Sequence, residues 1–238
     1  MIKIENLSKK FEKNKWVLKN LNFEIAKGEA IGILGANGSG KTTLIEIISG
    51  ISEPTEGKVN FISENKEIDN KIKESIGIQF QKGDWPFNTR GVDLLNLLIS
   101  KKWNKDEYIK ELINIFEVED ILTKRLSDLS GGQQQRFNSM ISIIKKPKIL
   151  ILDELITGLD LKMQIKLVNF FDNLRKKEDI TLIVISHIPE EIEKICNRII
   201  VLNKGEIYRD ESVKKIIKEY GSIRYFLEKY YEEIDDEK

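Results

Sequence analysis

The stretch "GANGSGKT", residues 35–42, decides the fold of this chain. It fits the pattern G-x-x-x-x-G-K-[ST], follows the apolar run "EAIGILG" and opens the helical pattern "KTTLIEIISG". In that context the glycines let consecutive backbone N–H groups turn inward around phosphate oxygens, and the helix start adds its positive end. We expect a phosphate-binding loop rather than a simple strand-to-helix corner. Its residues are Gly35, Ala36, Asn37, Gly38, Ser39, Gly40, Lys41, Thr42 and Thr43.

The side chains that would complete this site come from the loop itself and from the run "KILILDE", residues 148–154. Lys41 is expected to reach the β- and γ-phosphates, and the Thr42 hydroxyl to bind Mg²⁺. Asp153 is placed to hold that metal through water, and Glu154 to polarise an attacking water. Alone, a strand that ends in two carboxylates is a solvated strand end. Beside an intact phosphate loop, it indicates nucleotide hydrolysis.

The remaining pattern predicts the architecture. The N-terminal runs "MIKIENL" and "WVLKNLNFEI" read as strands, and "EAIGILG" is an apolar run typical of a strand covered on both faces. Two further strand runs follow at "KILILD" and "ITLIVISH". Between residues 85 and about 146, apolar residues recur at helical spacing. A hairpin is expected at Lys204-Gly205. We predict an α/β fold with a mostly parallel core sheet, an N-terminal antiparallel β subdomain and a helical insertion.

The composition excludes several classes of protein. Lys+Arg and Asp+Glu both number 39, so the chain has no global electrostatic reason to bind nucleic acid or an acidic membrane surface. The single cysteine, Cys196, rules out an internal disulfide and lies in an apolar run that favours a buried thiol. No apolar run approaches the roughly 20 residues of a membrane span, and the N-terminus lacks a signal peptide. A cytoplasmic protein is expected.

A second glycine-rich stretch, "LSGGQQQR" at residues 129–136, lies far along the chain from the first. Ser130 is a good helix N-cap, and the glycines expose N–H groups at the helix start, which makes a second anion site. The stretch resembles the signature motif of the ATP-binding cassette (ABC) ATPases. This resemblance implies that Ser130, Gly131, Gly132 and Gln133 meet the γ-phosphate of ATP held by a partner subunit, in a head-to-tail dimer. A chance capped helix is the alternative.

The resemblance covers nearly the whole chain and assigns further residues. Phe11 takes the place of the aromatic that stacks on adenine, although core packing would explain it too. Gln81 resembles the glutamine that touches Mg²⁺ and the water, with Gln79 as its competitor. Asp160 lies in the loop that crosses the dimer interface. His187, the chain's one histidine, resembles the switch histidine at the γ-phosphate.

The family comparison also sets the expected domains and the departures from the family pattern. The ATPase domain is expected over residues 1–225, with the helical subdomain at about 85–146 and a frayed acidic tail at 226–238. Leu155 stands where proline usually follows the catalytic glutamate, Ile156 where threonine is common, and Leu161 where proline often follows the aspartate. These positions shape the loop and put its rigidity in doubt.

The motif set is complete for an ATPase that uses ATP and Mg²⁺, and the resemblance implies a nucleotide-binding subunit of an ABC transporter. Membrane-spanning partner subunits, a homodimer or heterodimer of cassettes, and a place on the inner face of the cell membrane are expected. No nucleic acid is expected. The stretch 81–94, with "KGDWPF", is the expected docking site for the membrane subunit, and an exporter is favoured over an importer. The alternative is a soluble ABC ATPase, such as one that assists iron–sulfur assembly or one that is associated with nucleic acid.

Overall fold

The computed structural model describes residues 1–12, 15–63, 66–67, 75–79, 85–86, 88–99 and 102–236. Within this part of the chain, the elements assemble around a central sheet with strand order β10-β9-β3-β8-β7-β6. Its strands are β3 (Ala30–Leu34), β6 (Ile76–Gln79), β7 (Ile149–Asp153), β8 (Thr181–Ile185), β9 (Arg198–Asn203) and β10 (Glu206–Ser212). Neighbouring strands run parallel except β10, which pairs antiparallel with β9. The predicted hairpin and the mostly parallel core sheet are confirmed.

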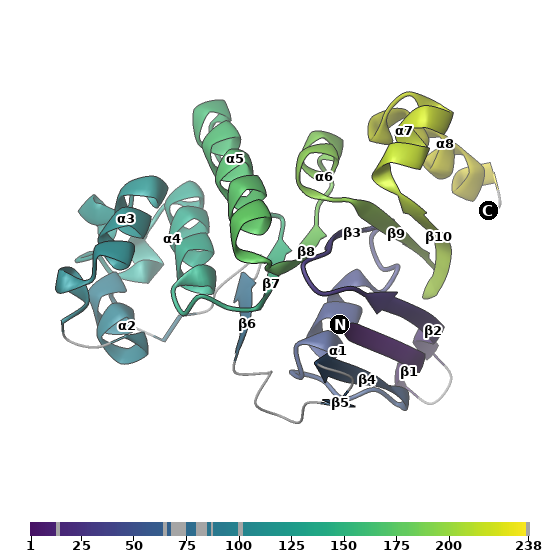
Figure 1. Ribbon diagram of the computed structural model, residues 1–238, viewed down its shortest axis with the longest axis horizontal. Helices are drawn as coiled ribbons and strands as arrows, with labels where there is room; N and C mark the ends of the chain where they lie inside the picture. Colours follow the sequence, from purple (N-terminus) through teal and green to yellow (C-terminus); the bar gives the residue numbers. More distant parts are fainter. Residues whose placement is uncertain are drawn as a thin grey trace.

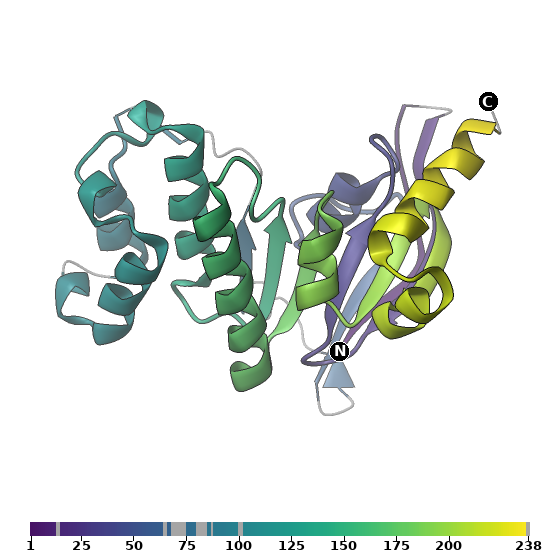
Figure 2. The ribbon, with the colours of Figure 1, turned by 90° about the horizontal axis from the view of Figure 1, so that it is seen from above.

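Both faces of this sheet are apolar, and successive residues of a strand point to opposite faces. In β7, Leu150 and Leu152 join the core beneath the helices α5 (Leu161–Glu178), α6 (Pro189–Ile195), α7 (Val213–Tyr220) and α8 (Ile223–Asp236). Ile149 and Ile151 join the opposite core, with α1 (Lys41–Ile48). Figures 1 and 2 show α1 on one side of the sheet and the later helices on the other. The apolar runs of the sequence are therefore the middle layer of the molecule.

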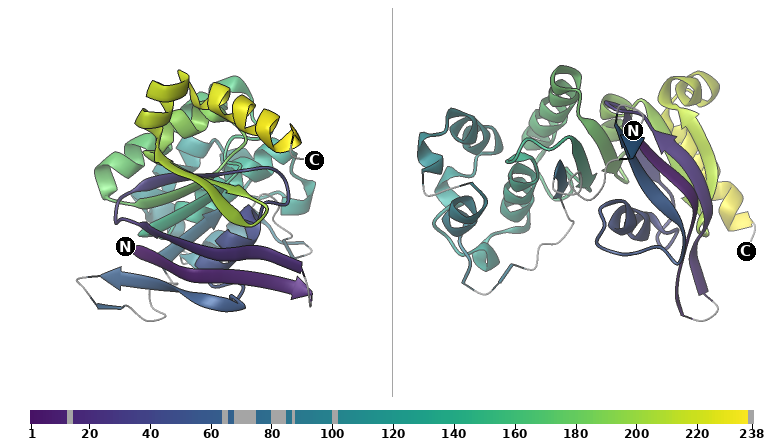
Figure 3. Two further views of the ribbon diagram at one scale, coloured as in Figure 1. Left: turned by 90° about the vertical axis from the view of Figure 1, so that its right-hand side faces the viewer. Right: turned by 60° about the horizontal axis from the view of Figure 1, so that its bottom comes forward.

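A second sheet packs outside α1. It has the order β2-β1-β4-β5, with β1 (Ile2–Glu12), β2 (Lys15–Ile25), β4 (Glu56–Ser63) and β5 (Lys66–Glu67). The pairings among its described residues are all antiparallel. Figure 3 shows this sheet with α1 against its inner side. The expected N-terminal antiparallel subdomain is confirmed, and its packing fixes α1 and the loop in front of it.

The helical insertion stands between β6 and β7. It holds α2 (Gly91–Leu98), α3 (Glu107–Phe116) and α4 (Gly131–Ile143), with short 3-10 turns at Trp103–Lys105, Glu119–Ile121 and Leu126–Asp128. In Figure 1 these helices form a separate group beside the β6 edge, with α4 nearest the sheet. In the part of the chain that is described, no helix is long and apolar enough to cross a membrane. The insertion puts the start of α4 at some distance from α1.

The C-terminal segment differs from the expectation. A frayed tail over 226–238 is wrong for the described residues, because α8 continues to Asp236 and a boundary at residue 225 falls inside it. Phe226, Tyr230 and Ile234 lie at helical spacing and are buried against the rest of the protein. Burial of that apolar stripe stabilises the helix despite the acidic residues on its outer side.

Candidate functional site

The loop between β3 and α1 has a backbone that only glycine adopts readily at two points. Gly35 has φ 139°, and a Cβ there would lie 2.2 Å from the Leu202 carbonyl oxygen. Gly40 has φ 106°, and a Cβ there would lie 2.5 Å from the Leu18 side chain. The chain thus turns tightly between β9 and β2 before α1 begins at Lys41. The first residues of that helix line the cavity described below.

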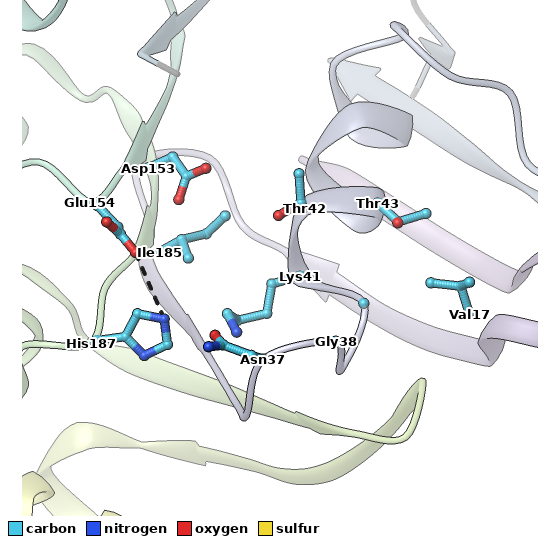
Figure 4. Close-up of a pocket in the computed structure, with 11 residues that line it drawn as sticks. Val17, Asn37, Gly38, Lys41, Thr42, Thr43, Asp153, Glu154, Ile185 and His187 are labelled. Atoms are coloured by element: carbon cyan, nitrogen blue, oxygen red, sulfur yellow. Dashed lines mark ion pairs between the residues drawn. The ribbon is translucent and has the colours of Figure 1, made fainter. Parts of the chain in front are cut away.

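Lys41 is the buried cation of this loop. Its Nζ donates to the carbonyl oxygens of Gly35, at 2.7 Å, and Ala36, at 3.0 Å. Burial lowers the pKa of Lys41, while the charges of Asp153 and Glu154 act against that change. Figure 4 shows the ammonium directed into the cavity from the loop. A phosphate would replace two neutral acceptors with a charged one, which strengthens the bond.

Two carboxylates face Lys41 from the end of β7. Burial, with the charge of Glu154 added, raises the pKa of Asp153 to about 6 against the opposing effect of Lys41. Figure 4 places the Thr42 hydroxyl and the Asp153 carboxylate on opposite walls of one cavity. Oxygen donors of these two kinds suit Mg²⁺, which keeps several waters and is completed by nucleotide phosphates. Among the described residues, no group of three or more His, Cys, Asp and Glu side chains that could hold a metal ion is found.

These groups surround a cavity of ≈ 510 Å³. Its lining residues are Val17, Asn37, Gly38, Gly40, Lys41, Thr42, Thr43, Asp153, Glu154, Ile185 and His187. The His187 side chain is 44% exposed, and its Nε2 lies 3.8 Å from Glu154 Oε1. The phosphate loop therefore meets Asp153, Glu154 and His187 in one place, although these residues lie over a hundred positions further along the chain. Val17 and Ile185 were missed by the sequence analysis, because an apolar residue in a strand gives no sign of lining a pocket.

Glu154 and the loop after it have an unusual backbone. Glu154 has φ 55°, in the left-handed region, and its N–H donates to the Ile185 carbonyl at 2.8 Å. Leu155 and Ile156, two of the departures from the family pattern, are buried apolar side chains. Leu161, the third departure, is exposed at the start of α5. Burial of the first two anchors this loop in the core without the proline.

The second glycine stretch starts α4 as expected. Ser130 is the N-cap: its hydroxyl accepts from the Gln133 N–H at 3.3 Å, and the Gln133 side chain accepts from the Ser130 N–H at 3.0 Å. A Cβ on Gly131 would meet nothing within 4 Å, so the helix start is open, whereas one on Gly132 would lie 3.1 Å from the Gly158 carbonyl oxygen. None of these residues lines the cavity. One copy of the chain does not bring the two glycine stretches together around that cavity.

The other predicted site residues are placed less directly. Asp160 caps α5 by accepting from the Met163 N–H at 3.0 Å. Phe11 is 64% exposed at the end of β1, outside the cavity lining, with the Lys9 ammonium 5.1 Å from its ring centroid. Gln81 lies outside the described residues. Its competitor Gln79 is fully buried, with Oε1 2.9 Å from the Ser139 hydroxyl of α4.

Of the expected docking stretch, "KGDWPF", the described residues are Trp85 and Pro86. Trp85 is half-buried and packs against the core of the helical group. Pro86 is exposed, and its carbonyl accepts from the Thr89 hydroxyl at 2.7 Å. The remainder of the stretch up to Phe87 lies outside the described residues, so docking there stays a prediction.

Two buried polar groups near the cavity were not found from the sequence. Gln135 of α4 binds the backbone just after β7, and its carboxamide Nε2 reaches the Glu154 carbonyl at 2.5 Å. Glu191 of α6 accepts from the hydroxyl of Ser186, the residue before His187, at 2.5 Å. Burial raises the pKa of Glu191 to about 7. In both cases, a polar residue on the buried side of a helix is the sequence feature that could have indicated such a group.

Comparison with known proteins identifies the family. The family model described as "ABC transporter" matches residues 18–157, more than half of the chain. The energy-coupling factor transporter ATP-binding protein EcfA2 of Acetivibrio thermocellus is 33% identical, over 92% of this chain and 85% of its own length. The methionine import ATP-binding protein MetN 2 of Oceanobacillus iheyensis is 32% identical, over 90% of this chain and 66% of its own. Relatives named for import do not support the exporter-type expectation.

Solved structures agree with this. The dimeric ATP-binding cassette MJ0796 bound to ADP and Pi has a TM-score of 0.78 at 28% identity, covering 89% of this chain and 98% of that one. The cbiO1 subunit of Clostridium perfringens, part of the ABC transporter complex cbiONQ, has a TM-score of 0.73 at 28% identity, covering 92% and 90%. A cassette fold, an intact nucleotide cavity and these sequence matches lead to one assignment. The chain belongs to the ABC transporter family, as one of its ATP-binding subunits, and is an ATPase.

Proposed function

We propose that this protein hydrolyses ATP to power the movement of a substrate through separate membrane-spanning subunits. One observation carries the proposal: Lys41, Glu154 and His187, from three different elements, face one cavity of ≈ 510 Å³. The direction of movement is not part of the proposal, because the membrane subunits select the substrate and its path. The names of the import relatives support an importer more than an exporter.

Each group in the cavity has a separate task in this proposal. The backbone N–H groups of residues 37–43 and the Lys41 ammonium bind the phosphates, as loops of this pattern do. The Glu154 carboxylate accepts a hydrogen bond from the attacking water and polarises it. His187, with Nε2 3.8 Å from Glu154, orients the γ-phosphate and that water. Phe11 stacks on the adenine at the open end of the site.

Mg²⁺ fits this donor set. The Thr42 hydroxyl and the Asp153 carboxylate, directly or through water, would hold it, with Gln81 as the third protein group that the family resemblance assigns. When bound, the ion neutralises charge on the β- and γ-phosphates. A divalent cation also favours the ionised form of Asp153, whose pKa burial raises to about 6.

The partners in this proposal are a second cassette and a membrane protein. The open N-terminus of α4 at Ser130 and Gly131 is suited to the γ-phosphate of a partner's ATP, with Asp160 at the interface between copies. This chain has both kinds of site, so a homodimer is sufficient, and a related cassette would serve equally. The membrane subunits hold the protein on the cytoplasmic face of the membrane, near Trp85.

The test compares the purified protein with Lys41→Ala. Wild-type protein is expected to hydrolyse ATP in the presence of Mg²⁺ and to co-purify with a multi-span membrane protein from its native membranes. Lys41→Ala is expected to lose turnover and to bind nucleotide weakly, because no other ammonium lines the cavity among the described residues. Wild-type turnover in Lys41→Ala would overturn the assignment of the phosphate site. Co-purification with nucleic acid or iron–sulfur proteins alone would overturn the transport role.

A further inference from the structure

Gln135 lies buried in α4, between the glycine start of that helix and the carboxylates at the end of β7. Its side chain is 7% exposed, an unusual place for an uncharged amide. The Nε2 group donates to two successive carbonyl oxygens, those of Glu154 at 2.5 Å and Leu155 at 3.0 Å. One carboxamide thus pairs with two successive backbone acceptors, of which the Glu154 carbonyl also accepts from the Thr157 N–H at a longer 3.3 Å.

Those two carbonyls belong to the strained turn that aims the Glu154 carboxylate. Glu154 has φ 55°, a region that side-chain-bearing residues adopt at a cost and only where their surroundings hold them. Its N–H is held by the Ile185 carbonyl at 2.8 Å, and its carbonyl is held by Gln135. The residue is therefore fixed from β8 on one side and from α4 on the other. Without Gln135, the Glu154 carbonyl keeps only the 3.3 Å bond from Thr157 within its own loop, and the restraint from α4 is absent.

The hydrogen bonds continue from Gln135 toward β6. The Ser139 hydroxyl lies 2.8 Å from the Gln135 carbonyl and 2.9 Å from Gln79 Oε1. Gln79 is the last residue of β6, the strand that leads to the segment before the helical insertion. In the same direction, the glycine start of α4 touches the loop after Glu154, since a Cβ on Gly132 would lie 3.1 Å from the Gly158 carbonyl oxygen. A displacement of α4 would therefore be transmitted to Glu154.

We propose that Gln135 is a positioning residue that holds the backbone of Glu154. Through this contact, the position of α4 determines the direction in which the Glu154 carboxylate points. The inference rests on the proposed role of Glu154. It predicts that the Glu154 carboxylate points at the attacking water when α4 is in its native position. Loss of the Gln135 carboxamide is expected to lower turnover and to leave phosphate binding intact. Gln135 itself is not among the residues that line the cavity.

The first experiment uses Gln135→Met, with Gln134→Met as the matched control. Gln134 is the neighbouring residue, and its Nε2 also donates to two backbone carbonyls, of Leu126 at 3.1 Å and Leu129 at 3.3 Å, away from Glu154. Gln135→Met is expected to lower kcat about tenfold while KM and nucleotide affinity stay within about twofold, because only the transition state needs the aimed carboxylate. Gln134→Met is expected to keep more than half of the wild-type kcat. Equal losses in both variants, or none in Gln135→Met, would overturn the proposal.

A second variant separates positioning from loss of structure. Gln135→Glu keeps the length of the side chain. The protonated carboxyl of this variant donates a single hydrogen bond, to one of the same two carbonyls. Its kcat relative to wild type is expected to rise as the pH falls from 8 to 6, whereas the ratio for Gln135→Met stays constant. A ratio for Gln135→Glu that is independent of pH while the variant remains folded would contradict the inference.

The double variant completes the design. Adding Gln135→Met to Glu154→Gln is expected to lower turnover no further than Glu154→Gln alone, since the positioned carboxylate is already absent. A further tenfold loss would show that Gln135 acts elsewhere and would overturn the proposal. If Glu154→Gln itself keeps wild-type turnover, the proposed role of Glu154 fails, which is distinguishable from a failure of Gln135 alone.

Discussion

The functional residues differ in what holds them, and Glu154 is held mainly through its backbone. Its N–H and carbonyl are bound by Ile185 and Gln135, while its carboxylate faces the cavity near His187. Replacing the carboxylate by an amide therefore changes the chemistry of the group and leaves its backbone restraints in place. This makes Glu154→Gln an informative substitution.

In Glu154→Gln, turnover is expected to fall at least about a hundredfold, the lower end of what a water-activating group contributes. ATP affinity should change little, because Lys41, Thr42 and the loop N–H groups hold the phosphates. Removal of one negative charge beside the γ-phosphate should also let the ATP-bound dimer persist. Steady-state hydrolysis and binding of a fluorescent ATP analogue measure both. Turnover near that of wild type would show that another group activates the water.

Glu191 gives a prediction on pH. Burial, to which the charge of Glu154 adds, raises its folded-state pKa to about 7 from the ordinary 4.5, although the Ser186 hydroxyl acts against it. Between about pH 4.5 and 7 the folded protein therefore binds more protons at this group than the unfolded chain, so its contribution to the free energy of unfolding falls as the pH rises. Glu191→Gln is expected to be more stable than wild type above pH 7, by at most about 3 kcal/mol, with no advantage below pH 4.5.

The control for this prediction is Glu190→Gln on the same helix. Glu190 is exposed, and its hydrogen bond with Arg224 lowers its pKa. Its replacement should leave stability unchanged or slightly lower above pH 4.5, the opposite sign to Glu191→Gln. Urea unfolding at pH 5, 6, 7 and 8 compares the two. A stability difference for Glu191→Gln that is constant over that range would exclude titration of Glu191 as its cause.

At the scale of elements, the sequence predicts best where a local pattern and burial agree. β3, α1 and the β9–β10 hairpin carry strong glycine or apolar signals, and each lies where its pattern indicates. β6 and α6 were missed because each is short, and the four residues of β6 pair only along β7. A helix was expected in the tail after Glu211, but the packing of α8 up to Asp236 was missed, because its acidic composition hides an apolar stripe that tertiary contacts bury. No local sequence pattern indicates such tertiary contacts.

α8 also reaches the nucleotide loop, through one hydroxyl. Tyr230 is 1% exposed, and its OH donates to the Leu202 carbonyl at 3.1 Å. Burial raises the pKa of Tyr230, while a hydrogen bond from the backbone N–H of Ala36 acts against that rise. Ala36 is in the phosphate loop, and the Leu202 carbonyl is the group that leaves no room for a side chain at Gly35. The helix that was expected to fray therefore supports the back of the loop.

Tyr230→Phe removes that hydroxyl and keeps the ring. It leaves a buried carbonyl and a buried N–H without this partner, so the free energy of unfolding is expected to fall by about 1–3 kcal/mol. Tyr231→Phe is the control, because its half-buried ring packs 5.1 Å from that of Tyr230 on the same helix. It should change stability by less than about 0.5 kcal/mol. Denaturant unfolding measures both, and equal effects would refute a specific role for the Tyr230 hydroxyl.

At the scale of the whole molecule, the chain has two glycine-rich helix starts that stand in different relations to the cavity lined by Lys41 and Glu154. The start of α1 lines that cavity, and the start of α4 does not. The sequence located both motifs and the residues of each, because their spacing is local. Their relation in space depends on the helical insertion and on a second copy, and no spacing in one chain specifies that. In the proposed dimer, the open surface at Gly131 is the part that would complete the partner's site.

Dimerisation of the protein in the presence of ATP should therefore be lost when the start of α4 is blocked. The protein is expected to be mainly monomeric without nucleotide and to dimerise with ATP, most stably in Glu154→Gln. In that background, Ser130→Arg places bulk and charge where the partner's γ-phosphate must lie, and the dimer should be lost.

The substitution also removes an N-cap, which costs about 1 kcal/mol by itself. Ser212→Arg controls for that cost, since Ser212 caps α7 with the same 3.3 Å bond, away from the cavity. Light scattering with ATP should show dimers for Ser212→Arg and monomers for Ser130→Arg. Dimers in both variants would mean that α4 does not close the partner's site.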